Sequence, residues 1–406
     1  MTEQYETIIL GSDGSSDQDL SSTALQERLG KVLAGAASTE GDRRSVKDIL
    51  IKEGQPIRAV VPGDFKSLSE DEYPPWNRQE LMALFNHLCP EWEEMIKEGA
   101  IDRPLPLQAG RYRVNMFSYG GEFSANDDQI GCTGELGMAI RIYRDQIPEL
   151  NTLGLPTPIA NLADSKAGLV IVTGPVGNGK TTTCAAFIDH INRTRAGHII
   201  TVEDPIEYLH RPIKCVITQR ELGANIQSMA RGARDAMREF PEAIFIGEVK
   251  EPDAAQAAIY SGNAGQLVLA SMHANGAVQS VSKLISFFPG QETVKADDMA
   301  ACLQGVISQI LVPSMEKTHW VPIFETLFVD NEARQLISKR DWMELQRYLD
   351  GKNNGEGKDG CVSRNASLVK AVVSGDISKE TAMRVSLDRS SLKNLLDSAA
   401  IPSRKA

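Results

Sequence analysis

One segment of the chain combines glycines, a lysine and a hydroxyl side chain at a spacing that suits phosphate binding. Residues 174–181 read Gly-Pro-Val-Gly-Asn-Gly-Lys-Thr and satisfy the pattern G-x-x-x-x-G-K-[ST]. Glycines let the backbone curl until successive N–H groups point inward, which makes a concave anion site. Lys180 can then reach the β- and γ-phosphates of a nucleotide, and the Thr181 hydroxyl can ligate Mg²⁺. The expected contact residues are Gly174, Pro175, Val176, Gly177, Asn178, Gly179, Lys180, Thr181 and Thr182.

Hydrolysis of a bound nucleotide also needs carboxylates that assist the metal and orient the attacking water. The segment TVEDPIEY supplies Glu203 at the end of one apolar run, and AIFIGE ends in Glu248. His273 closes a further run, QLVLASMH. Ligands of open α/β sheets bind at the edge where such strands end. We therefore expect both glutamates, as catalytic and metal-assisting groups, and His273 to lie close to whatever Lys180 binds.

These motifs require a sheet that presents them at one edge. After residue 168, the apolar runs GLVIVT, HIITVE, AIFIGE and QLVLASMH alternate with helical segments. Runs that are apolar on both faces and separated by helices indicate a parallel sheet covered on both sides. The phosphate loop follows the first run and precedes a helical pattern, which is the setting that such a loop needs. The sequence predicts an α/β core over residues 161–295.

The rest of the chain divides by composition. Residues 1–44 are polar and predict a flexible extension with one short amphipathic helix, whose apolar face is Leu25, Leu29, Val32 and Leu33. Short alternating stretches and one helical segment predict a small α+β domain at 45–147, followed by a proline-marked linker at 148–160. Residues 296–406 predict a mainly helical region with a flexible loop near 351–362.

A further helix is predicted in IQSMARGARDAMREF. Arg231, Arg234 and Arg238 share one face. The opposite, apolar face is Ile226, Met229, Ala233, Met237 and Phe240. The arginines are either a solvated stripe or a charge network that runs from the site to a subunit border.

Composition excludes several classes of protein. The net charge of −11 opposes a general attraction to nucleic acid or anionic lipid. The six cysteines have no Cys-x-x-Cys spacing, which argues against a zinc ribbon or a thiol redox motif. No apolar run approaches the ~20 residues that span a bilayer. We expect an intracellular protein that meets a membrane only through a partner.

Taken together, the motifs resemble the secretion and pilus ATPases, specifically their pilus-retraction (PilT-like) branch. Four signatures stand in the family's order: the Walker A loop at 174–181, the Asp box at 201–208, the Walker B segment at 245–248 and the His box at 271–277. Flanking stretches at 111–117, 149–156 and 303–313 are also similar. The resemblance covers roughly residues 45–345.

The resemblance implies a RecA-like P-loop ATPase domain, a smaller PAS-like α+β N-terminal domain and a homohexameric ring. It also implies hydrolysis of ATP with Mg²⁺, coupled to domain rotations that drive a type IV pilus or a related secretion machine. The chain would be cytoplasmic and would reach the inner membrane through a platform protein. Glu203 and Glu248 would be the acidic-box and Walker B glutamates, and His273 the His-box histidine. Arg111, Arg113 and Arg141 match arginines that act on the nucleotide across a domain or subunit border.

The chain departs from the family pattern at three places and lacks the tetracysteine zinc module of the assembly and type II secretion branches. The usual Gly-Glu-x-Arg-Asp is Gly247-Glu248-Val249-Lys250-Glu251, Gln266 replaces the first histidine of the His box, and Glu332-Ala333-Arg334-Gln335-Leu336 replaces Ala-Ile-Arg-Asn-Leu. A conjugation or type IVB secretion ATPase stays open, as does a ring subunit that binds nucleotide with little hydrolysis. A nucleic-acid translocase would need a basic stripe with interleaved aromatics, which the sequence lacks.

Overall fold

The computed structural model describes residues 22–38, 46–107, 110–120, 134–143, 146–351 and 359–399. These residues form two compact units, one made of the chain up to Val60 together with Phe65–Ile142, and the other made mainly of the chain from Tyr143 onward. None of the helices in these ranges is long and apolar enough to cross a membrane.

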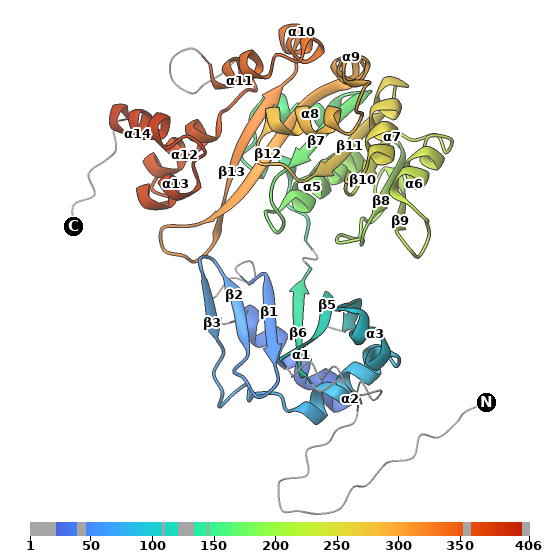
Figure 1. Ribbon diagram of the computed structural model, residues 1–406, viewed down its shortest axis with the longest axis vertical. Coiled ribbons are helices and arrows are strands. Elements are labelled where there is room, and N and C mark those ends of the chain that lie inside the picture. The colour runs from blue at the N-terminus through green and yellow to red at the C-terminus, as the bar shows by residue number, and fades with distance from the viewer. Residues whose placement is uncertain are drawn as a thin grey trace, which may run out of the picture. The chain divides into compact units, whose positions relative to one another are not determined.

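The first unit is an antiparallel sheet with three helices (Figure 1). Its strand order is β3-β2-β1-β6-β5-β4. The strands are β1 (Asp48–Lys52), β2 (Arg58–Val61), β3 (Asp64–Ser67), β4 (Ile101–Leu107), β5 (Gly110–Tyr119) and β6 (Glu135–Ile142). The helices are α1 (Ser22–Ser38), α2 (Arg78–Leu88) and α3 (Trp92–Glu98).

Helix α1 packs on this unit through an apolar face. The four expected residues, Leu25, Leu29, Val32 and Leu33, are each at most 2% exposed. The guanidinium of Arg28 pairs with Glu80 and lies 4.6 Å from the centre of the Trp76 ring. The same Glu80 caps α2, because its other oxygen accepts from the Asn77 backbone N–H. The remainder of the expected N-terminal extension lies outside the described residues.

The second unit contains a seven-stranded sheet in the order β13-β12-β7-β11-β10-β8-β9. All neighbouring pairs are parallel except β12 with β13. The strands are β7 (Gly168–Thr173), β8 (Gly197–Glu203), β9 (Cys215–Glu221), β10 (Ala243–Ile246), β11 (Leu267–Met272), β12 (Leu303–Pro313) and β13 (Trp320–Phe328). The four predicted runs form β7, β8, β10 and β11, which confirms the predicted α/β sheet, and the sheet continues past the predicted bound of residue 295 with β12 and β13.

Helices connect these strands and extend the unit toward its C-terminus (Figure 1). They are α4 (Thr157–Ala160), α5 (Lys180–Thr194), α6 (Met229–Ala236), α7 (Pro252–Asn263), α8 (Ala277–Ser286) and α9 (Glu292–Cys302). After β13 come α10 (Asn331–Lys339), α11 (Trp342–Asp350), α12 (Arg364–Val373), α13 (Lys379–Val385) and α14 (Arg389–Ser398). Two 3₁₀ turns, Leu150–Thr152 and Asn161–Asp164, precede β7.

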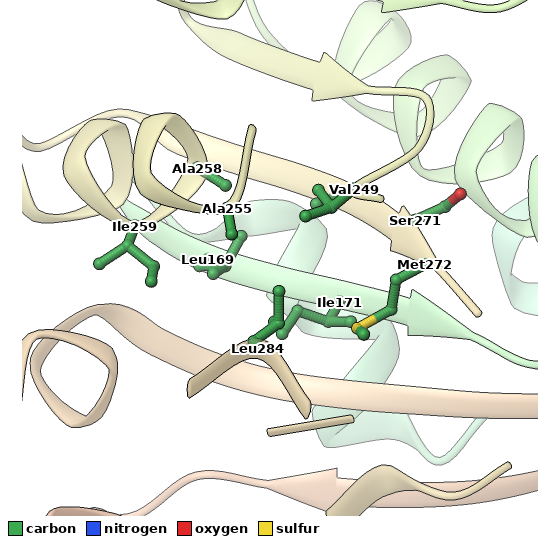
Figure 2. A pocket seen from close by; sticks show the side chains of 10 residues that line it. Leu169, Ile171, Val249, Ala255, Ala258, Ile259, Ser271, Met272 and Leu284 are labelled. Atoms are coloured by element: carbon green, nitrogen blue, oxygen red, sulfur yellow. The ribbon is translucent and has the colours of Figure 1, made fainter. Parts of the chain in front are cut away.

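Helices cover both faces of the seven-stranded sheet. On one face, Leu169 of β7 packs with Leu284 of α8 and with the alanine-rich side of α7, as Figure 2 shows. On the other face, Val170 packs with Phe187 of α5. The small space in Figure 2 is lined by apolar side chains apart from Ser271, so we assign it to core packing. Burial on both faces explains why the strand sequences are continuously apolar.

Two expectations differ from the structure. The region after residue 296, expected to be mainly helical, also contains β12 and β13, because an apolar run such as LQGVISQILVP fits a buried strand as well as a helix. The helix around Arg234 ends at Ala236, and Phe240 is 93% exposed with a positive φ of 54°. The prediction that Phe240 belongs to the apolar face of this helix is therefore wrong. Pro241 follows it, and a residue before proline is disfavoured in the right-handed helical conformation.

Candidate functional site

The phosphate loop connects β7 to α5, whose first residue is Lys180. Two of its glycines permit close approach to β12. A Cβ at Gly174 would lie 2.1 Å from the backbone carbonyl oxygen of Gln309. A Cβ at Gly179 would lie 2.8 Å from the side-chain nitrogen, Nε2, of the same glutamine. Both glycines also have positive φ angles, 144° and 77°. Pro175, Val176 and Gly177 form an exposed tip. The loop therefore has the curled, glycine-dependent backbone that the sequence predicts.

Lys180 is buried and its ammonium group turns back toward the loop. The Lys180 Nζ donates to the Pro175 carbonyl oxygen at 3.0 Å and lies 3.2 Å from the His273 Nδ1. Burial lowers the pKa of Lys180. A negatively charged phosphate beside this ammonium would offset the cost of its burial.

His273 links Lys180 to Glu248. The His273 Nε2 is 3.1 Å from Glu248 Oε1, and its Nδ1 faces Lys180 and the Gly174 carbonyl. In the neutral ring protonated at Nε2, His273 donates to the Glu248 carboxylate and accepts from Lys180 at Nδ1, which then makes no hydrogen bond to the Gly174 carbonyl. Lys180, His273 and Glu248 thus form one continuous chain of contacts at the edge of the sheet, as the sequence predicts.

Glu248 lies just beyond β10, and neighbouring strands fix the backbone around it. The Gly247 N–H donates to the Val202 carbonyl at 2.7 Å, and the Val249 N–H donates to the Ser271 carbonyl at 2.8 Å. The second oxygen of Glu248 is 2.8 Å from the Lys250 ammonium. The lysine that departs from the family pattern is therefore an ion-pair partner of the expected catalytic carboxylate.

Glu203 ends β8, the strand next to β10, and is only 4% exposed. Its Oε1 accepts from the Thr201 hydroxyl at 2.6 Å and from Gln219 Nε2 at 3.1 Å. Burial raises the pKa of Glu203 to about 7. Glu203 therefore lies at the expected strand end, with its hydrogen bonds directed to β8 and β9 rather than to Lys180.

The residues present suit a nucleotide with Mg²⁺. Across the described ranges, no group of three or more His, Cys, Asp or Glu side chains could hold a metal alone. Mg²⁺ usually takes one or two protein ligands and completes its shell with phosphate oxygens and water. Thr181 stands in the first turn of α5, beside the curled loop. The Thr182 hydroxyl is hydrogen-bonded within the protein, because it lies 2.8 Å from the Tyr208 hydroxyl.

The three expected arginines belong to the first unit. Arg113 of β5 makes two hydrogen bonds to Asp102, at 3.1 and 3.2 Å, and Arg141 of β6 donates to Asp48 at 2.9 Å. These ion pairs join neighbouring strands of that sheet. Arg111 lies in β5, and its side chain is outside the described residues. Their expected action on a nucleotide stays a prediction.

The contacts from β12 that hold the phosphate loop were not predicted from the sequence. Gln309, which is 4% exposed, accepts from the Thr183 hydroxyl at 2.6 Å and donates to the Asn178 carbonyl at 2.8 Å. The Asn178 side chain accepts from the Leu311 N–H at 2.7 Å. One signal was available, because a glutamine inside an otherwise apolar run must find buried partners.

The other departures from the family pattern lie away from this chain of contacts. Gln266 precedes β11, at the opposite end of that strand from His273. Arg334 donates to the Ala300 and Ala301 carbonyls at the end of α9, where a positive charge is favourable. Glu251 is exposed and precedes α7.

The three expected arginines are exposed, Arg231 and Arg234 on α6 and Arg238 two residues beyond its end. Arg231 forms an ion pair with Asp235 of the same helix at 2.8 Å, and Arg238 lies 3.9 Å from the same carboxylate. These contacts are local, and the network to a subunit border stays a prediction.

His210, which follows the Asp box, supports a prediction about pH. Its Nδ1 is buried with no hydrogen-bond partner among the described residues, and burial lowers the pKa of His210 to about 4. The unfolded chain therefore takes up this proton first as the pH falls below 6.5. We expect the free energy of unfolding, measured by urea titration, to fall by about 1–2 kcal/mol from pH 7 to pH 5 through this group.

A His210→Gln variant should lose that part of the pH dependence, whereas the exposed His87→Gln should keep it. Equal slopes of stability against pH in the His210 variant and the wild type would contradict the assignment.

A sequence model of type II/IV secretion system proteins matches residues 138–366. The type IV pilus ATPase PilU of Pseudomonas aeruginosa is 34% identical over 61% of this chain and 64% of its own length. A twitching motility protein of Neisseria gonorrhoeae is 32% identical over 68% of this chain and 69% of its own length. The matched part of the chain thus spans about two thirds of these relatives.

A solved structure extends the likeness to nearly the whole chain. The crystal structure of the pilus retraction motor PilT with bound ADP superposes with a TM-score of 0.72 and 30% identity. It covers 90% of this chain and 99% of the solved chain. The predicted fold class, a RecA-like core with a smaller N-terminal domain and C-terminal helices, is confirmed by this match.

Proposed function

Since the chain belongs to the type II/IV secretion system protein family, in its PilT-like branch, we propose that it is a motor that hydrolyses ATP. The observation that carries the proposal is the chain of contacts from Lys180 through His273 to Glu248, beside a curled glycine loop. The relatives that match include a pilus retraction motor and a twitching motility protein. We therefore propose that the motor retracts a type IV pilus or drives a related secretion machine.

Each group has a distinct role in this proposal. The loop N–H groups and Lys180 bind the phosphates, and His273 contacts the γ-phosphate. Bound Mg²⁺, ligated by Thr181 and approached by Glu203 and Glu248 through its water shell, would neutralise charge on the phosphates. Glu248 orients the attacking water and accepts its proton.

The proposal extends to assembly and place in the cell. Six copies would form a ring, and Arg111, Arg113 or Arg141 would act on a nucleotide across a domain or subunit border. The motor would act on a partner protein of the inner membrane. Binding to that partner would hold the cytoplasmic ring at the membrane. Ring formation would make hydrolysis depend on assembly, because an arginine supplied in trans can raise the rate by ~10³ to 10⁵.

The test is phosphate release by the purified full-length chain. We expect release to require Mg²⁺, and the rate per chain to rise about tenfold or more as light scattering shows assembly. The same preparation with excess chelator is the control. Equal phosphate release with and without Mg²⁺ would contradict the motor.

A second function is favoured by one contact. Lys250 pairs with Glu248 at 2.8 Å and competes with water for that carboxylate. In a ring subunit that binds nucleotide and hydrolyses it slowly, this ion pair would lower the rate by keeping Glu248 from the attacking water. Tight binding of ATP without turnover in wild type, together with turnover in Lys250→Ala, would support this second function.

A further inference from the structure

The C-terminal helices contact the loop that carries His273. Helices α12 and α14 pack on β12 and β13 through an apolar cluster that includes Ile310, Ile323, Leu368 and Leu392. The first residue of α12 is Arg364, whose side chain turns into the protein and leaves the residue only 7% exposed. A buried arginine at this position needs partners for its charge and its donors.

Arg364 finds those partners at the His273 loop. Its guanidinium donates to the Asn275 carbonyl oxygen and lies 3.4 Å from the Ser308 hydroxyl of β12. Asn275 is two residues after His273, in the segment that joins β11 to α8. An arginine on a C-terminal helix therefore holds the backbone beside the histidine that reaches Lys180 and Glu248.

A buried acid holds the other end of the same loop. Glu325 of β13 is 5% exposed and accepts from the Ala277 N–H at 2.6 Å, at the start of α8. Arg364 and Glu325 attract each other, and each charge lowers the cost of burying the other. Arg364 of α12 and Glu325 of β13 thus each contact this loop, at Asn275 and at Ala277.

The start of this loop is also fixed. The Lys283 ammonium donates to the His273 carbonyl at 2.6 Å, and the Ala274 N–H donates to the Thr173 hydroxyl at 3.0 Å. Thr173 is the last residue of β7, directly before the phosphate loop. Arg364 therefore supplies the anchor that comes from the C-terminal helices, within a loop otherwise fastened to the sheet and α8.

We propose that Arg364 is a positioning residue, through which the C-terminal helices set how strongly the His273 loop engages the γ-phosphate. This inference rests on the proposed function, because it assumes that His273 contacts the γ-phosphate. A force or a partner that moves α12 would displace the Asn275 carbonyl and shift the preference of the site between ATP and ADP.

The test compares two affinities in the full-length chain. Arg364→Met should weaken binding of a non-hydrolysable ATP analogue by about tenfold and change ADP affinity by less than about twofold, because ADP lacks the γ-phosphate. Arg364→Lys, which keeps the charge but carries its donors on a single nitrogen, should recover part of the preference. Arg384→Met, an exposed arginine on α13, is the control and should change neither affinity. Equal losses for both nucleotides in Arg364→Met would overturn the proposal.

A double variant separates positioning from folding. Arg364→Met alone leaves Glu325 buried without its opposite charge, so it lowers stability as well. Arg364→Met with Glu325→Gln removes both charges and keeps an acceptor for the Ala277 N–H. We expect the double variant to regain stability and to keep the weakened preference for the ATP analogue. If the preference returned with stability, the role of Arg364 would be structural only.

The ratio of the affinities for the ATP analogue and for ADP also separates a failure of this inference from a failure of the motor proposal. A wild-type chain that binds ATP analogue and ADP but releases no phosphate would contradict the motor, and the Arg364 ratio would still be measured. A wild-type chain that hydrolyses ATP while Arg364→Met retains its full preference would contradict the Arg364 proposal alone.

Discussion

Replacing Glu248 with glutamine should reduce the rate of ATP hydrolysis by about 10²- to 10⁴-fold, the range that general-base catalysis supplies. Glutamine keeps the size of the side chain and can still hydrogen-bond to His273, but it cannot accept a proton from water. The loop and Lys180, which bind the phosphates, are unchanged. We therefore expect ATP affinity to stay within about threefold of wild type, since the change removes an interaction made in the transition state. Phosphate release and fluorescent-nucleotide titration measure the two quantities.

The matched control is Glu251→Gln, three residues further on. Glu251 is exposed and precedes α7, so its replacement should leave hydrolysis close to wild type. A Glu248→Gln chain whose kcat stayed within about threefold of wild type would remove Glu248 from the chemistry. The proton would then have to be accepted elsewhere, and Glu203 at the end of the adjacent β8 would become the candidate.

The convergence of Lys180, Glu248 and His273 could be predicted because it depends on one property of parallel sheets. Strands that run in the same direction end at the same edge, so residues that follow them meet there. The lengths and paths of the connections between them do not matter to this argument. Four apolar runs and a glycine loop were therefore enough to place three side chains that are far apart in the sequence.

The contacts from β12 and from the C-terminal helices could not be predicted in the same way. Gln309 reaches the phosphate loop because its strand, β12, lies beside β7. Arg364 reaches the His273 loop because β13 pairs antiparallel with β12 and carries the C-terminal helices to that side of the sheet. The apolar run LQGVISQILVP, which forms β12, does not reveal from its sequence whether it is a helix or a strand, nor which strand it pairs with. The prediction for Phe240 was wrong for a local reason. Periodicity extended the helix past Ala236, where it ends, and Phe240 directly precedes Pro241, which disfavours the helical conformation at that residue.

The change with the second large effect is Lys180→Ala, which we expect to lower kcat/KM for ATP by about 10²- to 10³-fold, the cost of removing one preorganised donor at a developing charge. Lys180 is the buried cation of the loop, and its ammonium also lies 3.2 Å from His273. Alanine therefore removes the charge that meets the phosphates and the donor that fixes the histidine ring. Unlike Glu248→Gln, this variant should also lose affinity for ADP, because Lys180 reaches the β-phosphate.

Two controls separate charge from geometry. Lys180→Arg keeps the charge, but its planar fork cannot replace a compact ammonium that donates to the Pro175 carbonyl at 3.0 Å, so it should also be nearly inactive. Lys214→Ala, an exposed lysine on the same unit, should match wild type. If wild type and Lys180→Ala released phosphate at the same slow rate, the measured activity would come from a contaminant or another site. The motor proposal would then fail at its first step, because a loop that binds no phosphate leaves Glu248 and His273 without a substrate.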